Sequence, residues 1–190
     1  MTNMAVARSV EKPRLSLRAQ ALATLAAIVG AVAVPQLFHV LGAISGLGTG
    51  LGETFLPMHL PIILVGLLAG PYAGLVAGAC GPLASFALSA MPGAAMLPFM
   101  MIELACYGLV AGLLRNAQLP AIGKVLAAQA IGRLVRAAAI LLSVYAFGNE
   151  AIQVATIWNS IVVGLPGLIL QWVLLPLIIF WVERKQNNGQ

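Results

Sequence analysis

One stretch of the sequence, Lys124 to Phe147, is long and apolar enough to cross a lipid bilayer, yet it contains two arginines. At about 1.5 Å per helical residue, Arg133 and Arg136 lie ~13 and ~18 Å beyond Lys124 along the helix axis. In a hydrocarbon core ~30 Å thick, that depth is too great for either side chain to reach the polar surface beside Lys124 easily. A spacing of three residues places both side chains on one face of the helix.

A guanidinium inside a bilayer is costly, by at least ~2.5 kcal/mol, so such residues usually face the bundle interior and meet a carboxylate, a cavity or a ligand. The two arginines therefore predict a small helical bundle around a polar pocket. We expect Arg133 and Arg136 to lie in or beside the wall of that pocket.

Composition agrees with a membrane protein that consists almost entirely of its spans. Of the 190 residues, 61% are hydrophobic and only 8% are charged, whereas a soluble domain carries about 25% charged residues. We expect an all-α polytopic membrane domain at residues 15–185, between a basic cytoplasmic tail at 1–14 and a short tail at 186–190. The formal charge of +5 does not indicate nucleic-acid binding, because the basic residues lie mostly at the expected membrane edges.

Clusters of glycine and proline divide the apolar sequence into six segments. The expected transmembrane helices cover residues 15–40, 57–69, 72–90, 98–114, 124–147 and 153–182. The first apolar run is longer than the 7–15 residues typical of a cleavable signal peptide, so we expect this helix to be retained. Five glycines within residues 42–52 predict a flexible loop rather than a helix, and residues 91–98 form a second loop on the same side.

The basic residues predict the orientation of the six spans. Outside the spans, Lys and Arg occur before the first helix, between the fourth and fifth (Arg115, Lys124) and after the sixth (Arg184, Lys185). These three places lie on one side of a six-span chain, and the loops on the other side contain no Lys or Arg. The positive-inside rule then places both termini in the cytoplasm of a multi-pass plasma-membrane protein.

With this topology, polar residues from several helices gather in the outer half of the bundle. Glu103 lies ~7 Å below the outer surface, and Arg136 passes the midplane from the other side, so the two are expected at similar depth. Together they predict a pocket that opens to the outside beneath flexible loops. The expected substrate-binding residues are Glu53, His59, Glu103, Tyr107, Arg133, Arg136 and Asn159.

Structural roles are an alternative for several of these residues. An ion pair between Glu103 and Arg136 would also serve only to hold the helices in register. Arg133 would then lack a partner, and a ligand carboxylate or phosphate would supply the missing anion. His59 is also compatible with a satisfied interfacial residue, and Asn159 with a cap at the start of the sixth helix.

The sequence offers little for catalysis or metal binding. It has no Ser/His/Asp or His-Glu-x-x-His arrangement and no Gly-x-Ser-x-Gly. Cys80 and Cys106 are expected to be buried free thiols, because no Cys-x-x-Cys or Cys/His cluster is present. We therefore predict a protein that is not an enzyme and has neither a cofactor nor a metal site.

Three blocks of the chain resemble the substrate-binding S components of energy-coupling factor (ECF) transporters. The blocks are LPMHLPIILVGLLAGPYAGLVAGACGPLASFALSAMPGAAMLPFMMIELACYGLVAGLL, AIGRLVRA and GLPGLILQWVLLPLI. The resemblance implies a subunit that binds a vitamin or related micronutrient near the outer face. It also implies docking on a transmembrane coupling subunit that is driven by two cytosolic ATPase subunits.

The resemblance further assigns roles to two kinds of segment. Alanines four residues apart in the first helix make a smooth stripe for close helix packing, and the family's contact with the coupling subunit matches Ala19, Ala23 and Ala27. Residues 42–52 and 91–98 match the loops that gate the pocket. A carboxylate-bearing vitamin suits Arg133 and Arg136, although pantothenate, cobalamin, folate, a pyrimidine precursor and haem-like ligands are all compatible with the family.

Two other functions are compatible with the sequence. One is a stand-alone secondary transporter that couples transport to protons through Glu103 and His59. The other is a structural or assembly membrane protein that binds no ligand. Retention of a small vitamin by the purified protein favours the ECF role, whereas proton-driven uptake by this chain alone favours the secondary transporter.

Overall fold

A computed structural model describes residues 15–48 and 50–187; the basic tail predicted at 1–14 lies outside the described residues. The described part is all-helical and contains no strand. Six stretches are long and apolar enough to cross a membrane, which confirms the predicted number of spans. The helices are α1 (Leu17–Ser45), α2 (Gly50–Phe55), α3 (His59–Ala69), α4 (Pro71–Ser89), α5 (Leu97–Leu113), the 3-10 turn η1 (Leu114–Asn116), α6 (Ala121–Phe147) and α7 (Ala155–Asn187).

The glycine-rich segment at 42–52 is more helical than predicted. The first helix continues to Ser45, and α2 already begins at Gly50 and extends with α3 as one span. A single glycine costs a helix only about 1 kcal/mol, and Gly42 gains a contact that offsets this cost. The carbonyl of Gly48 occupies the place of a Cβ on Gly42, and the Gly48 N–H donates to the Gly42 carbonyl at 3.0 Å. The helix then ends at Gly46, which is left-handed with a φ of 75°.

Glycines bring α3 and α4 into close contact with α5. A Cβ on Gly74 would overlap the backbone of Gly108, and a Cβ on Gly108 would overlap the backbone of Gly74. Gly66 in α3 and Gly78 in α4 meet the α5 backbone in the same way. These glycines therefore allow the helix backbones to touch where side chains would separate them.

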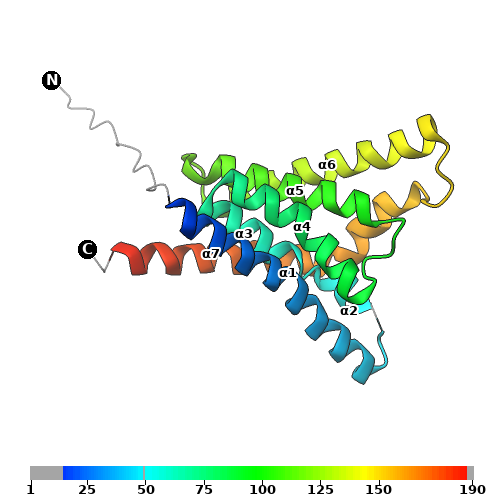
Figure 1. Ribbon diagram of the computed structural model, residues 1–190, viewed down its shortest axis with the longest axis horizontal. Coiled ribbons are helices and arrows are strands. Elements are labelled where there is room, and N and C mark those ends of the chain that lie inside the picture. Colours follow the sequence, from blue (N-terminus) through cyan, green and yellow to red (C-terminus); the bar gives the residue numbers. More distant parts are fainter. Residues whose placement is uncertain (1–14, 49, 188–190) are drawn as a thin grey trace.

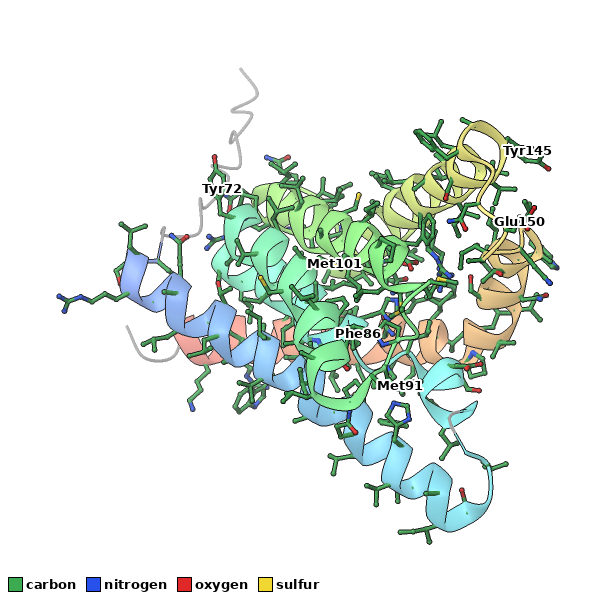
Figure 2. The ribbon with its side chains drawn as sticks, turned by 45° about the vertical axis from the view of Figure 1, so that its right-hand side comes forward. Tyr72, Phe86, Met91, Met101, Tyr145 and Glu150 are labelled. Carbon is green, nitrogen blue, oxygen red and sulfur yellow. The ribbon has the colours of Figure 1, made fainter. Side chains whose placement is uncertain are left out.

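The ends of the described chain lie together. Figure 1 shows that α1 begins and α7 ends at one end of the bundle, while α6 and α7 join at the opposite end. In Figure 2, Tyr72 beside the α3–α4 turn lies far from Tyr145 near the end of α6 and from Glu150 in the α6–α7 connection. The orientation of this bundle in the membrane stays a prediction from the basic residues.

The alanine stripe of α1 packs largely within the subunit. Ala27 and Ala31 are buried in the main core, and a Cβ on Gly81 of α4 would lie 3.2 Å from the Ala31 methyl group. Ala23 is half-buried against the same core, and Ala19 is half-buried. Contact of this stripe with a coupling subunit stays a prediction, and only Ala19 and Ala23 keep surface for it.

Candidate functional site

A cavity of about 430 Å³ lies in the half of the bundle that holds the α4–α5 and α6–α7 connections. All seven α-helices contribute to its wall, together with the turn at residues 56–58 and the loop before α5. Cavities of 300–1,000 Å³ are typical of small-molecule sites. Six of the seven residues predicted to bind substrate line it: Glu53, His59, Glu103, Arg133, Arg136 and Asn159.

The predicted lids differ in how much they contribute. Met91, Pro92, Gly93 and Met96, from the segment predicted as the second lid, all line the cavity. From residues 42–52, the structure places only Gly52 in the wall.

Glu103, Arg136 and Tyr107 form a buried charged cluster between α5 and α6. The Arg136 Nη1 donates to Glu103 Oε2 at 3.0 Å, and the Tyr107 hydroxyl donates to Oε1 at 2.6 Å. Glu103 is 1% exposed and Arg136 is 9% exposed. The ion pair considered from the sequence is therefore present, and both of its members still face the cavity. Tyr107 is fully buried behind Glu103 and is not in the wall.

Gly132 explains how α6 approaches α5 closely enough for this pair to form. A Cβ on Gly132 would overlap the Tyr107 ring, so the ring packs directly against the α6 backbone. Arg136 follows Gly132 by one helical turn, and Glu103 precedes Tyr107 by one turn. The contact between ring and glycine thus sets the depth at which the two charged groups meet.

Arg133 has a different environment from Arg136, although both were predicted on one face. Its side chain is half-buried and lines the cavity, and its Nε is buried without a hydrogen-bond partner. Among the residues that the structure describes, its guanidinium has no hydrogen-bond or ion-pair partner. The cavity therefore contains a cationic group that the described protein does not neutralise.

His59 is held by the turn that precedes α3. Its Nδ1 lies 3.1 Å from the Leu56 carbonyl, which can only accept, so Nδ1 carries the proton and Nε2 is left as an acceptor. His59 is buried, with 3% of its surface exposed, and its ring centroid lies 5.3 Å from that of Tyr107. Leu56 itself is left-handed, with a φ of 48°, which is rare for a branched residue.

A chain of amide hydrogen bonds supports this unusual leucine. Trp172 Nε1 donates to Gln129 Oε1 at 2.6 Å, Gln129 Nε2 donates to Gln171 Oε1 at 2.8 Å, and Gln171 Nε2 donates to the Leu56 carbonyl at 3.2 Å. Gln129 and Gln171 are buried. This chain of hydrogen bonds was not predicted, although two glutamines inside apolar spans were the available signal.

The helix α7 makes room for the same turn. A Cβ on Gly167 would lie 2.5 Å from the Phe55 backbone, and a Cβ on Gly164 would lie 2.7 Å from the Leu56 side chain. The turn therefore fits against α7 only where that helix lacks side chains.

Two predicted residues lie at the exposed edge of the site. The side chains of Glu53 in α2 and Asn159 in α7 are exposed, although both contribute to the cavity wall. The alternative that Asn159 caps its helix is wrong, because α7 begins at Ala155 and Asn159 lies inside its second turn.

Several wall residues were not predicted. They include His39, Ser85, Met58 and Met100, whereas Met91 and Met96 belong to the predicted second lid. The described residues contain no cluster of three or more His, Cys, Asp or Glu side chains arranged to hold a metal ion.

Comparison with known proteins adds one finding to this geometry. A family model described as "ECF transporter, substrate-specific component" matches residues 20–179. No curated protein and no solved structure matches the chain.

Proposed function

This chain belongs to the family of ECF transporter substrate-specific components, and we propose that it captures a vitamin-like small molecule in its cavity for ATP-driven uptake. The family consists of substrate-binding transporter subunits rather than enzymes, and membership agrees with six helices able to span the cell membrane. Its members associate with a transmembrane coupling subunit and ATPase subunits. The vitamin-like substrate and the ATP-driven coupling are the parts that we propose.

The observation that carries the proposal is the cavity itself. A space of about 430 Å³ with two guanidinium groups and two carboxylates in its wall lies within a largely apolar helical bundle. Charged groups in a membrane span are costly, and when they surround a cavity they mark a substrate pathway or binding site. A protein with only a structural role in the membrane has no need for this arrangement.

We assign the cavity residues two kinds of role. Arg133, His59, Asn159 and Glu53 offer polar groups to the substrate, the last two from the exposed edge. Glu103 is already bonded to Arg136 and Tyr107. These three residues therefore determine the shape and charge of the cavity wall more than they bind the substrate directly. The loop at Met91 to Met96 covers the cavity and is proposed to move when substrate enters or leaves.

We propose that α1 carries the contact with the coupling subunit. Its outward face is apolar and exposed along much of its length, including Leu22, Leu25 and Val29. Ala19 and Ala23 lie beside this face and leave space for a close helix approach.

The test separates binding from transport. The chain alone is purified in detergent and examined by mass spectrometry for a retained small molecule, and uptake is then measured with and without the coupling and ATPase subunits. We expect the chain alone to bind its substrate, and uptake to require the other subunits and ATP. Proton-gradient-driven uptake by proteoliposomes containing this chain alone would instead identify a secondary transporter.

A further inference from the structure

The charges in the cavity wall do not balance. Arg136 and Glu103 neutralise each other at 3.0 Å, and the Glu53 side chain is exposed and therefore largely screened by water. Arg133 remains as one cation without an ion-pair partner among the described residues. One unbalanced cation in the wall favours a ligand that carries one negative charge.

The geometry of Arg133 favours a carboxylate as that charge. A guanidinium presents its N–H donors as a planar fork, which matches the two oxygens of a carboxylate. The Nε of Arg133 is buried and has no partner, so a donor inside the protein is left without an acceptor. A doubly charged phosphate would need a second free cation, and Arg136 is already paired with Glu103.

Two further polar groups in the wall lack partners. Ser85 is 1% exposed, and its hydroxyl makes no hydrogen bond within the described part of the chain. His59 has its Nδ1 occupied by the Leu56 carbonyl, which leaves Nε2 to accept a hydrogen bond. Both residues line the cavity. The Ser85 hydroxyl can donate or accept a hydrogen bond there, whereas His59 Nε2 can only accept one, so the imidazole favours a ligand that carries an N–H or O–H donor.

The remaining wall is rich in thioether groups. Met58, Met91, Met96 and Met100 line the cavity and belong to three different parts of the chain. Methionine sulfur makes favourable contacts with aromatic rings, and its flexible side chain adapts to a flat surface. This lining favours a planar ring as the body of the ligand.

We infer that the substrate is a monocarboxylate built on a planar heteroaromatic ring that carries an N–H or O–H donor. The carboxylate pairs with Arg133, the donor reaches His59 Nε2, and the ring lies among the methionines. This inference rests on the proposed function, because it names the class of substrate for the same cavity.

The test begins with the compound itself. The full-length chain is purified from cells grown in rich medium, and any small molecule released on denaturation is identified by mass spectrometry. Its affinity is then compared with that of its primary amide, which has nearly the same shape but no charge. We expect the acid to bind about 10- to 100-fold more tightly than the amide, as for a hydrogen bond to a charged group.

Variants of Arg133 locate the charge recognition. In Arg133→Gln, the acid should lose about 10- to 100-fold in affinity and the preference over the amide should disappear. Arg133→Lys should keep a preference for the acid. Arg184→Gln removes one positive charge at the opposite end of the bundle, and it should change neither affinity. The comparison of acid with amide on the unmodified chain stands even where a variant fails to fold.

The possible outcomes separate this inference from the proposed function. Release of a neutral or cationic compound overturns the monocarboxylate assignment and leaves a substrate-binding subunit. Equal affinity for acid and amide does the same. If the chain releases no compound and no monocarboxylate micronutrient supplied at millimolar concentration stabilises it, the cavity is not a capture site and both proposals fail.

Discussion

The ion pair between Glu103 and Arg136 makes the sharpest prediction about stability. We consider Arg136→Gln, Glu103→Gln and the double variant that combines them. Glu103→Gln removes the charge and keeps the shape of the side chain, whereas Arg136→Gln removes the charge and also shortens the side chain. Tyr107, which donates to the other oxygen of Glu103, stays in place in all three proteins.

The expected magnitude follows from the geometry. Two unit charges 3.0 Å apart attract by about 5 kcal/mol at an effective dielectric constant of ~20. Breaking a buried pair by removing one partner typically costs 3–5 kcal/mol, because the other charge is left uncompensated. We expect about 3 kcal/mol or more for Arg136→Gln, since the Glu103 side chain that would lose its partner is only 1% exposed. Glu103→Gln should cost less, because the Arg136 side chain is 11% exposed and faces the cavity.

The double variant tests whether the two charges act on each other. Because it removes both charges together, it should be more stable than Arg136→Gln alone, with a coupling free energy of about 2 kcal/mol or more. The measurement is the free energy of unfolding in mixed detergent micelles as the fraction of denaturing detergent rises. Strict additivity of the two single variants, or a cost below about 0.5 kcal/mol for Arg136→Gln, would refute the reasoning.

Substitutions at the same ion pair also predict an effect on ligand binding. In Arg136→Ala, the Glu103 carboxylate loses its partner and faces the cavity as a free negative charge. Because the proposed substrate is an anion, its affinity should fall tenfold or more, which is about 1.4 kcal/mol. Arg136→Ala/Glu103→Gln should recover most of that loss. Calorimetric titration of the purified protein measures both, and unchanged affinity in a folded Arg136→Ala protein would contradict the prediction.

Three further predictions concern packing, the amide chain and docking. Gly108→Ala should lower the free energy of unfolding by about 1–3 kcal/mol through overlap with α4, whereas Gly93→Ala, which has open space around it, should leave it unchanged. Gln171→Leu should lower the free energy of unfolding by about 1–3 kcal/mol, because it leaves buried amide and carbonyl groups unpaired, and it should also weaken substrate binding. If this variant is as stable as the parent protein, the amide chain does not support the turn at Leu56. Leu25→Gln on the exposed face of α1 should lower uptake several-fold without changing substrate affinity. Leu177→Gln on α7 should change neither uptake nor affinity. If the two variants show equal uptake, the coupling subunit does not dock on this face of α1.

The sequence was sufficient to predict the number of spans and the half of the bundle that holds the cavity. Both follow from quantities that depend on one helix at a time: the length of an apolar run and the rise per residue. The similar depth of Glu103 and Arg136 was predicted in this way, and the 3.0 Å ion pair confirms it. Prediction failed at residues 42–52, where the stability of helix α1 beyond Val40 depends on a contact that Gly42 makes with a later residue.

The partners of the polar side chains were harder to predict, because they depend on contacts between helices. Arg133 and Arg136 share a face, yet only Arg136 meets Glu103, since the depth of α6 is set by packing of Gly132 on Tyr107. Nothing in the spacing of the two arginines contains that information. The left-handed Leu56 was also beyond reach, because its conformation is supported by Gln171 from a helix more than one hundred residues later.

The contrast between polar groups with and without partners supports the proposal that the cavity binds a substrate and is not a packing defect. A membrane span normally pairs its buried polar groups internally, as the charges of Glu103 and Arg136 and the amides of Gln129 and Gln171 do. The Nε of Arg136 and the amide nitrogen of Gln36, which lies outside the cavity wall, are also unpaired, so an unpaired nitrogen alone does not identify a site. Arg133 differs because its unpaired charge borders a space large enough for a ligand, and an unoccupied cation there costs the free protein stability. A ligand that supplies the missing anion should therefore raise the unfolding temperature, and it should do so less in Arg133→Gln.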